Sequence, residues 1–503
     1  METTSARALA ELVGDLTTDR PPRYAALAGR VRRLVADGRV PLGTRLPAER
    51  ELATALAVSR ATVTAAYTRL REDGWATARQ GAGTFAALPA GPHRGAWVPG
   101  PVDDGAIDLA HAAPAAPAAV PAALAAALEE LPRFLASHGY HPAGLPDLRA
   151  RIAGRYTTRG LPTTPEQVLV TNGALHGVSI GFAALLGRGR RVLVEQPSYP
   201  NALQAARALG ARVVPVALDP GDPAAWLDAT ERALSAVRPA AAYLMPDFQN
   251  PTGVLLDAAG RERLARALRR SGVPAVVDET FAELGLDTSA PLPLAAFGAG
   301  HLSVGTLSKV AWGGLRVGWV RAEADVVRRL TAVAVRTSMS GPVVEQLAAC
   351  ALLDGLDDAL PILRAQLRER RAVLTAELRQ RLPGWRVPEP AGGLVLWCGL
   401  PTPRSRAVVA AAERFGLRLA AGPLFGTGHA STTGSGCPTP SRRTCCAARR
   451  PCSRGPTPRR PAPGCPRTTG RARCPSSDRA AALRVPAAGR PTGSCRPPHG
   501  SRG

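Results

Sequence analysis

The chain has 503 residues, which is enough for two or three domains with large buried cores. Its composition is 45% hydrophobic but only 4% aromatic, so we expect cores built mainly from alanine, leucine and valine. No apolar run reaches the roughly 18–20 residues that a membrane-spanning helix requires, and the N-terminus lacks a basic segment followed by an apolar one. These features argue against a membrane protein, and we expect a cytoplasmic one.

The net charge of +24 is unevenly distributed along the chain. Residues 427–503 contain fifteen arginines against one acid, Asp478, so this segment carries +14 and the rest of the chain +10. Seven of the nine cysteines also lie there, which leaves Cys350 and Cys398 in the body of the chain. This distribution does not suit a disulfide framework and is consistent with a reducing compartment.

The first structural pattern is a small helical domain, predicted over residues 17–88 after a flexible N-terminus at residues 1–16. Apolar residues at helical spacing predict helices over residues 23–36 and 61–72, the second with Ser59 as its N-cap. The glycines that follow indicate a tight turn between two short strands. Helices, a short turn and a hairpin in this order are typical of a winged helix-turn-helix.

This domain resembles the DNA-binding domain of the GntR family across nearly its whole length. The matching motifs are Leu46-Pro47, Arg50-Glu51-Leu52-Ala53, Val58-Ser59-Arg60 and Gly81-Ala82-Gly83-Thr84-Phe85. In such domains the N-terminal part of the recognition helix faces the major groove. The resemblance implies a double-stranded DNA operator as partner and contacts from Arg50, Arg60, Thr62, Thr64 and, at the wing tip, Gln80 and Gly81. Taken singly, the two threonines would equally suit a solvated helix face.

Residues 89–106 are rich in proline and glycine without apolar periodicity, which is typical of a linker. Beyond it, over residues 107–426, short β-branched runs alternate with helical stretches. Strands that are apolar on both faces predict an α/β domain with a mostly parallel sheet, whose ligands bind at the carboxyl ends of the strands. Six strands are expected, over residues 168–171, 192–195, 213–218, 240–246, 275–278 and 302–305.

Lys309 is the only lysine in the chain, since all other residues of the Lys+Arg count are arginines. Arginine cannot replace lysine in Schiff-base chemistry because its guanidinium stays protonated, whereas a partly desolvated lysine amine can attack an aldehyde. Arg316 follows seven residues later among glycines, and its planar guanidinium suits a phosphate. We therefore interpret Lys309 as the site of a Schiff base with pyridoxal 5'-phosphate (PLP).

Further candidate residues fall at the ends of the expected strands. Gly173 and Ala174 lie in a strand-to-helix turn, where backbone N–H groups and the helix dipole favour a phosphate. Tyr199 is placed where it could stack on a pyridine ring, and Asn250 opens an Asn-Pro-Thr-Gly loop. Asp278 ends an apolar strand, where an unpaired carboxylate would be costly but one paired with a pyridinium nitrogen is stabilised.

Together these elements resemble the cofactor site of fold-type I PLP-dependent aminotransferases. The resemblance implies that Lys309 carries the cofactor, Arg316 holds its phosphate and Asn250 binds its ring hydroxyl. The other cofactor-binding residues that it implies are Gly173, Ala174, Tyr199, Asp278, Thr306, Ser308 and the partner subunit's Tyr140, in a homodimer. On the sequence alone, Tyr140 could equally be a packing residue. No metal site is expected.

The chain departs from that family at two places. Three residues after the aspartate, the family usually has a tyrosine on the ring hydroxyl, and Phe281 stands here instead. The family also places an arginine for the substrate carboxylate in a strand shortly after the segment that ends at Phe425, and no such strand is recognisable. We interpret residues 427–503 as a disordered tail that results from a frameshift; a genuine basic tail that binds nucleic acid is the alternative.

A GntR-type domain joined to an aminotransferase-like domain resembles the MocR-like branch of GntR regulators. The resemblance implies a PLP-dependent, DNA-binding transcriptional regulator that is dimeric through its aminotransferase-like domain. It would sense PLP, an amine or an amino acid through the internal aldimine. Two alternatives remain: an amino-acid transaminase with an accessory DNA-binding domain, and a DNA-binding protein with a vestigial core.

Overall fold

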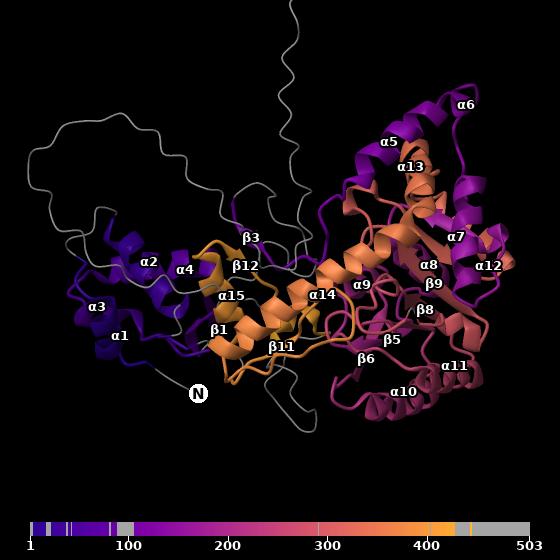
Figure 1. Cartoon of the computed structure of the whole chain (residues 1–503). Helices are drawn as coiled ribbons and strands as arrows, with labels where there is room; N and C mark the ends of the chain where they lie inside the picture. The colour runs from indigo at the N-terminus through magenta and orange to yellow at the C-terminus, as the bar shows by residue number, and fades with distance from the viewer. Residues whose placement is uncertain are drawn as a thin grey trace, which may run out of the picture.

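A computed structural model describes the positions of most of the chain. The described residues are 4–16, 22–36, 39–41, 43–79, 82–87, 105–289, 291–402, 404–427 and 443–444. Within them, a small N-terminal domain and a larger α/β domain are distinguished (Figure 1). None of the described helices is long and apolar enough to span a bilayer.

The N-terminal domain is the predicted winged helix-turn-helix. Ser59 caps the recognition helix as expected, because its hydroxyl oxygen accepts a hydrogen bond from the N–H of Thr62 at 3.1 Å. The two strands pair antiparallel and form the hairpin. The elements of this domain are α1 (Ala6–Val13), α2 (Arg23–Ala36), α3 (Glu49–Ala55), α4 (Arg60–Glu72), β1 (Ala76–Arg79) and β2 (Gly83–Ala86).

The expectation of a flexible segment over residues 1–16 is wrong for α1. Its N-cap, Ser5, accepts a hydrogen bond from the N–H of Ala8 at 3.2 Å. Leu9 and Val13 are four residues apart and therefore lie on the same face of the helix, where both are buried against α2 and α3. The helix is thus part of the core of the N-terminal domain.

The larger domain is built on a seven-stranded sheet with the order β4-β10-β9-β8-β7-β5-β6. All neighbouring pairs are parallel except those of β10, which runs antiparallel to β4 and β9. The six predicted strands are present, and β10 is an addition that the sequence did not predict. The strands are β4 (Val168–Thr171), β5 (Arg191–Gln196), β6 (Arg212–Ala217), β7 (Ala241–Leu244), β8 (Ala275–Asp278), β9 (His301–Thr306) and β10 (Gly318–Arg321).

Helices cover both faces of this sheet (Figure 1). Successive strand residues point to opposite faces, so Val276 packs in the core beneath α8, α9 and α12, whereas Val277 packs in the core beneath α10 and α11. The helices of the larger domain are α5 (Ala119–Glu130), α6 (Pro132–Leu135), α7 (Pro146–Thr158), α8 (Ala174–Leu185), α9 (Pro200–Ala208), α10 (Pro223–Val237), α11 (Ala258–Ser271), α12 (Ala324–Ala334), α13 (Val343–Asp354), α14 (Leu356–Arg381) and α15 (Ser405–Glu413).

The long helix α14 leads to a small subdomain made from distant parts of the chain. β3 (Ile107–Asp108) pairs parallel with β12 (Leu417–Arg418), and β11 (Cys398–Gly399) pairs antiparallel with β13 (Arg443–Thr444). β13 lies in the segment for which no strand was predicted. Most of the predicted linker, residues 89–104, lies outside the described residues. α15 of the subdomain contacts α2 of the DNA-binding domain (Figure 1).

Candidate cofactor site and nucleic-acid interface

Lys309 lies in the loop that follows β9, at the carboxyl edge of the sheet. Its Nζ donates a hydrogen bond to the carbonyl oxygen of Ala112 at 2.8 Å and lies 5.9 Å from the centre of the Phe281 ring. Burial lowers the pKa of Lys309 to about 8, with Asp278 opposing the shift and Arg316 adding to it. The amine therefore loses its proton far more readily than an exposed lysine, as attack on an aldehyde requires.

Arg316 is brought against the N-terminus of α8. Its Nη2 donates a hydrogen bond to the carbonyl oxygen of Asn172 at 2.8 Å. A Cβ added to Gly173 would lie 2.8 Å from the same Nη2, and one added to Gly318 would lie 2.6 Å from the carbonyl carbon of Gly173. Only glycine at these two positions permits the approach. The guanidinium and the free N–H groups of the first turn, which begins at Ala174, together form a site suited to a phosphate.

The two ends of the loop that carries Lys309 are fastened to each other. The hydroxyl oxygen of Thr306 lies 2.9 Å from the carbonyl oxygen of Val317 and 3.0 Å from the hydroxyl of Ser308. The N–H of Ser308 donates to Thr306 Oγ1 at 3.1 Å. These contacts hold Lys309 and Arg316 in one loop of defined shape.

Asp278 is supported by a tyrosine that the sequence analysis missed. The hydroxyl of Tyr243, in β7, donates a 2.7 Å hydrogen bond to Asp278 Oδ2, and the N–H of Thr280 donates to Oδ1 at 3.0 Å. Burial raises the pKa of Tyr243 well above its usual range, so its hydroxyl remains protonated and able to donate. The one signal in the sequence is a tyrosine within the Ala-Ala-Tyr-Leu strand.

Tyr199 precedes α9 and lies within electrostatic reach of the same groups. Burial raises the pKa of its hydroxyl, with a further rise from Asp278 and an opposing effect from Arg316. Its hydroxyl oxygen accepts a long hydrogen bond from Asn201 Nδ2 at 3.4 Å. Asp278 and Arg316 thus influence the pKa of both Tyr199 and Lys309, and the binding of a pyridine ring by these residues stays a prediction.

The Asn250 loop is anchored by a second pair that the sequence analysis missed. Gln249 Nε2 donates to Glu195 Oε2 at 3.0 Å and to the carbonyl oxygen of Pro197 at 2.7 Å. Gln249 Oε1 accepts from the N–H of Thr252 at 3.0 Å, which closes the loop around Asn250. Because Glu195 lies next to the last residue of β5, this pair links the carboxyl edge of the sheet to the half-buried Asn250.

Two aromatic residues that the sequence analysis singled out, Tyr140 and Phe281, differ from the other candidates for the cofactor site. Tyr140 is 55% exposed and its ring stacks on His138, with centres 5.5 Å apart, so the packing interpretation of this residue is not supported. Phe281 is buried beside Lys309, and its ring has no hydroxyl to offer a cofactor.

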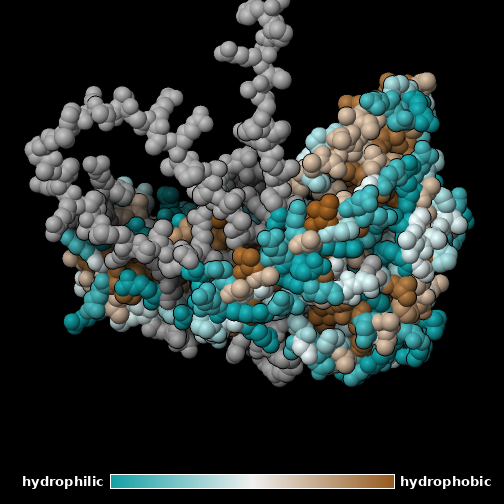
Figure 2. All heavy atoms as spheres, viewed as in Figure 1, coloured by the Kyte–Doolittle hydropathy of each residue, from teal (hydrophilic) through white to brown (hydrophobic). Residues whose placement is uncertain are grey.

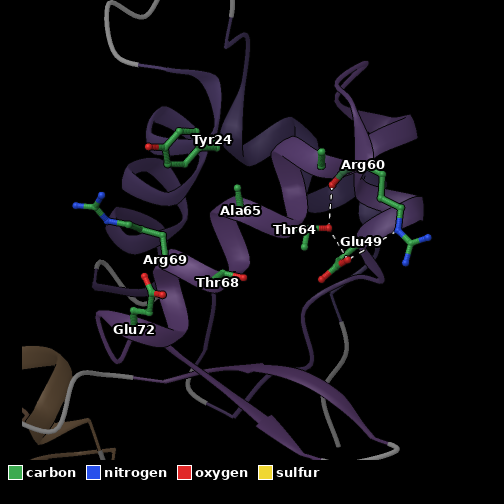
Figure 3. Close-up of a pocket in the computed structure, with 9 residues that line it drawn as sticks. Tyr24, Glu49, Arg60, Thr64, Ala65, Thr68, Arg69 and Glu72 are labelled. Atoms are coloured by element: carbon green, nitrogen blue, oxygen red, sulfur yellow. Dashed lines mark hydrogen bonds and ion pairs between the residues drawn. The ribbon is translucent and has the colours of Figure 1, made fainter.

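In the DNA-binding domain, Arg50 and Arg60 are exposed at the start of α3 and α4. The threonines are engaged within the protein: the hydroxyl of Thr62 lies 2.9 Å from Ser59 Oγ, and that of Thr64 donates to Glu49 Oε2 at 2.7 Å. Glu49, which the sequence analysis missed, also lies 3.9 Å from Arg60 Nε (Figure 3). Gln80 and Gly81 lie outside the described residues.

Comparison with family models assigns both parts of the chain. Residues 106–449 match the model described as aminotransferase class I and II, and residues 23–86 match that of bacterial regulatory proteins of the gntR family. The first match extends beyond residue 426, into the segment that was interpreted as a frameshifted tail. The second coincides with the winged helix-turn-helix.

Known proteins of two kinds are similar to this chain. The uncharacterized HTH-type transcriptional regulator YdcR of Escherichia coli is 30% identical over 438 residues, which cover 81% of this chain and 92% of YdcR. A second regulator of this kind, YdfD of Bacillus subtilis, is 26% identical over 413 residues, covering 75% and 84%. The crystal structure of LysN, an α-aminoadipate aminotransferase from Thermus thermophilus complexed with N-(5'-phosphopyridoxyl)-L-leucine, aligns with a TM-score of 0.60 and 29% identity, covering 68% of this chain and 87% of LysN.

Proposed function

Because the chain belongs to the aminotransferase class I and II family and joins that domain to a GntR-family DNA-binding domain, as MocR-like regulators do, we propose that it is a PLP-dependent transcriptional regulator. Its aminotransferase-like domain would sense PLP itself, an amine or an amino acid, and the DNA-binding domain would respond. The similarity to the two regulators covers 81% and 75% of this chain, whereas the similarity to the aminotransferase covers 68%. That difference favours regulation over an accessory role for the DNA-binding domain.

The observation that carries the cofactor assignment is the loop containing Lys309 and Arg316. Burial lowers the pKa of Lys309 to about 8, so its amine loses its proton more readily than an exposed lysine does, and Arg316 is held at the N-terminus of α8 where a phosphate is stabilised. Asp278, supported by Tyr243, offers a carboxylate to a protonated ring nitrogen. When bound, PLP supplies an aldehyde and an electron-withdrawing ring. The chain's own residues thus provide a partner for each polar end of that cofactor.

We also propose that the regulator is a homodimer assembled through its larger domain. Leu128, Leu135 and Met339 are between 51% and 69% exposed, and apolar side chains gather over α5 and α13 in Figure 2. Apolar exposure of this kind is typical of a surface that another chain covers. The exposed Tyr140 would then be available to the cofactor site of the partner subunit.

A path for coupling the two domains runs along α14. The segment after Asp278 is tied to this helix by arginines: Arg371 donates to both carboxylate oxygens of Asp287, at 2.6 and 2.8 Å, and Arg364 donates to the carbonyl oxygen of Glu283 at 2.9 Å. α14 continues into the small subdomain, whose α15 contacts α2. A ligand that moved the segment after Asp278 would therefore act on an element connected to the DNA-binding domain, provided that it binds the two arrangements with different affinity.

The proposal is tested by loading the purified protein with PLP, reducing it with borohydride and mapping the labelled peptide. Label at Lys309 supports the cofactor assignment, and label elsewhere refutes it. DNA binding is then titrated with the loaded and unloaded protein, in the presence and absence of amino acids. A DNA affinity that is indifferent to PLP and to every amine tested would refute the sensing role. A multiple-turnover assay separates the regulator from a transaminase.

A further inference from the structure

The exposed face of α4 is hollowed into an open groove of about 700 Å³, between Tyr24 of α2 and Glu49 of α3 (Figure 3). Its floor is made by small side chains of the recognition helix: Ala61, Thr64, Ala65 and Thr68. A recognition helix that reads guanine or adenine does so with long donors such as arginine, asparagine or glutamine. The floor of this groove is built from a different kind of side chain.

The two threonines of the floor have their hydroxyls engaged within the protein. Thr64 donates to Glu49 Oε2 at 2.7 Å, and Thr68 Oγ1 accepts from Arg71 Nη2 at 2.9 Å. Each of these threonines also carries a methyl group, and together with the methyl groups of Ala61 and Ala65 they make the floor rich in methyl groups. Contact with the methyl group of alanine or threonine is the way in which proteins recognise the C5-methyl of thymine in the major groove.

The charges around the floor favour the edge of a DNA duplex as its occupant. Arg60 and Arg69, with side chains 72% and 54% exposed, line the groove toward its two ends and suit the phosphates on either side of a major groove. Glu49 and Glu72 also line it and disfavour a phosphate near the floor. The C5-methyl of thymine carries no charge that these glutamates would repel, and the methyl itself needs no hydrogen-bond partner.

We propose that α4 recognises thymine in its operator through apolar contacts between the thymine C5-methyl and the floor formed by Ala61, Thr64, Ala65 and Thr68. This inference rests on the proposed DNA-binding function and adds the class of base that the helix reads. Arg60, which is exposed and only loosely paired with Glu49 at 3.9 Å, is left to contact a phosphate or a neighbouring guanine.

The experiment begins with selection of duplexes from a randomised library by the full-length protein. In the enriched duplex, each thymine is replaced in turn by deoxyuridine, which lacks only the C5-methyl and keeps the pairing with adenine. Dissociation constants are measured by fluorescence anisotropy at one fixed salt concentration. At one or two thymines of each half-site, we expect the affinity to fall about four-fold, the effect of losing one buried methyl group. At thymines outside the enriched positions no change is expected.

Protein variants then connect the effect to the groove. The variants Ala65→Ser and Ala61→Ser each place a hydroxyl against the C5-methyl of thymine. The dissociation constant for the deoxyuridine duplex, divided by that for the thymine duplex, should then fall from about four toward about one. The matched control is Ala55→Ser, at an exposed alanine of α3 that does not line the groove, and it should keep the ratio of the parent protein.

The outcomes separate this inference from the function on which it rests. Enrichment of a sequence in which no deoxyuridine substitution matters would overturn the thymine inference and leave DNA binding intact. Ratios that the Ala61 and Ala65 variants do not change would overturn it as well, because the methyl would then be read elsewhere. If no duplex is enriched at all, the proposed DNA-binding function fails together with the inference.

Discussion

The guanidinium of Arg316 occupies the space that a side chain at Gly173 would need. An added Cβ would lie 2.8 Å from Nη2 and 3.0 Å from Cζ, and the backbone of Gly173 has a φ of 85°, in the left-handed region. The pairing explains why the turn before α8 requires glycine: it seats the arginine at the N-terminus of that helix, where the helix dipole favours an anion.

Replacing Gly173 by alanine should therefore weaken PLP binding at least about ten-fold, because Arg316 must leave the helix terminus and a charge-assisted contact to phosphate is lost. Gly189→Ala is the matched control: its φ is 77°, but nothing lies within 4 Å of the added Cβ. Both variants should lose ~1–3 kcal/mol of stability from backbone strain, and only the first should lose affinity. A PLP titration followed by absorbance measures the difference. Equal PLP affinities of the two variants would contradict the role of Gly173 in placing Arg316.

The second prediction concerns the pH dependence of cofactor attachment. Since burial lowers the pKa of Lys309 to about 8, the rate of covalent PLP attachment to the unloaded protein should rise with pH and level off above about pH 8. A rate that continues to rise about ten-fold per pH unit up to about pH 10 would show an amine that behaves as an exposed one. Lys309→Arg should show no covalent attachment at any pH, because its guanidinium stays protonated.

The third prediction concerns stability and Glu195. Burial raises the pKa of this carboxyl to about 7, although hydrogen bonds from the N–H of Met245 and from Gln249 oppose the shift. The folded state therefore holds a proton that the unfolded state has released, and stability should fall by ~1–3 kcal/mol as the pH rises from about 4.5 to about 7. In Glu195→Gln the melting temperature should change less over this window. The exposed Glu129→Gln should follow the parent protein, and identical profiles for all three would contradict the assignment.

The fourth prediction is that the protein turns over amino donors far more slowly than the roughly 1–1,000 per second of ordinary enzymes. Phe281 is buried, and the centre of its ring lies 5.9 Å from Lys309 Nζ. It lacks the hydroxyl that would bind the ring oxygen of the cofactor. Phe281→Tyr should move the midpoint of the pH-dependent absorbance change of the PLP-bound protein to lower pH, because a donated hydrogen bond stabilises the anionic ring oxygen. Turnover at ordinary enzyme rates in a multiple-turnover assay would refute the proposal that the protein acts as a regulator and not as a transaminase.

The fifth prediction is that Arg60→Ala weakens binding to a selected operator by ~1–3 kcal/mol if Arg60 reads a base edge. Its side chain is 72% exposed at the first residue of α4 and is only loosely paired with Glu49, at 3.9 Å. Arg7→Ala, at a 91% exposed arginine of α1, is the control for a general loss of positive charge. Equal effects of the two substitutions in a titration at fixed salt would show that Arg60 contributes charge alone.

The parts of this molecule that were predictable from local sequence are those in which partners are near one another in the chain. The capping of α4 by Ser59 involves a residue three positions away, and Lys309 and Arg316 share a single loop. Five of the six predicted strands are apolar runs that are largely buried on both faces, and β6, at the edge of the sheet, is partly exposed. β10 escaped prediction because it begins with Gly318 and ends with the buried Arg321, so it does not form an apolar β-branched run.

The remaining features depend on which strands and helices become neighbours. Tyr243 reaches Asp278 only because β7 and β8 pair in parallel and in one register, and Gln249 reaches Glu195 only because β5 lies beside β7. Thr64 looked like a residue with a free hydroxyl until the packing of α3 against α4 placed Glu49 beside it. Residue types and spacing specify the chemistry that is available, whereas long-range pairing specifies which polar groups satisfy each other and which remain for a ligand.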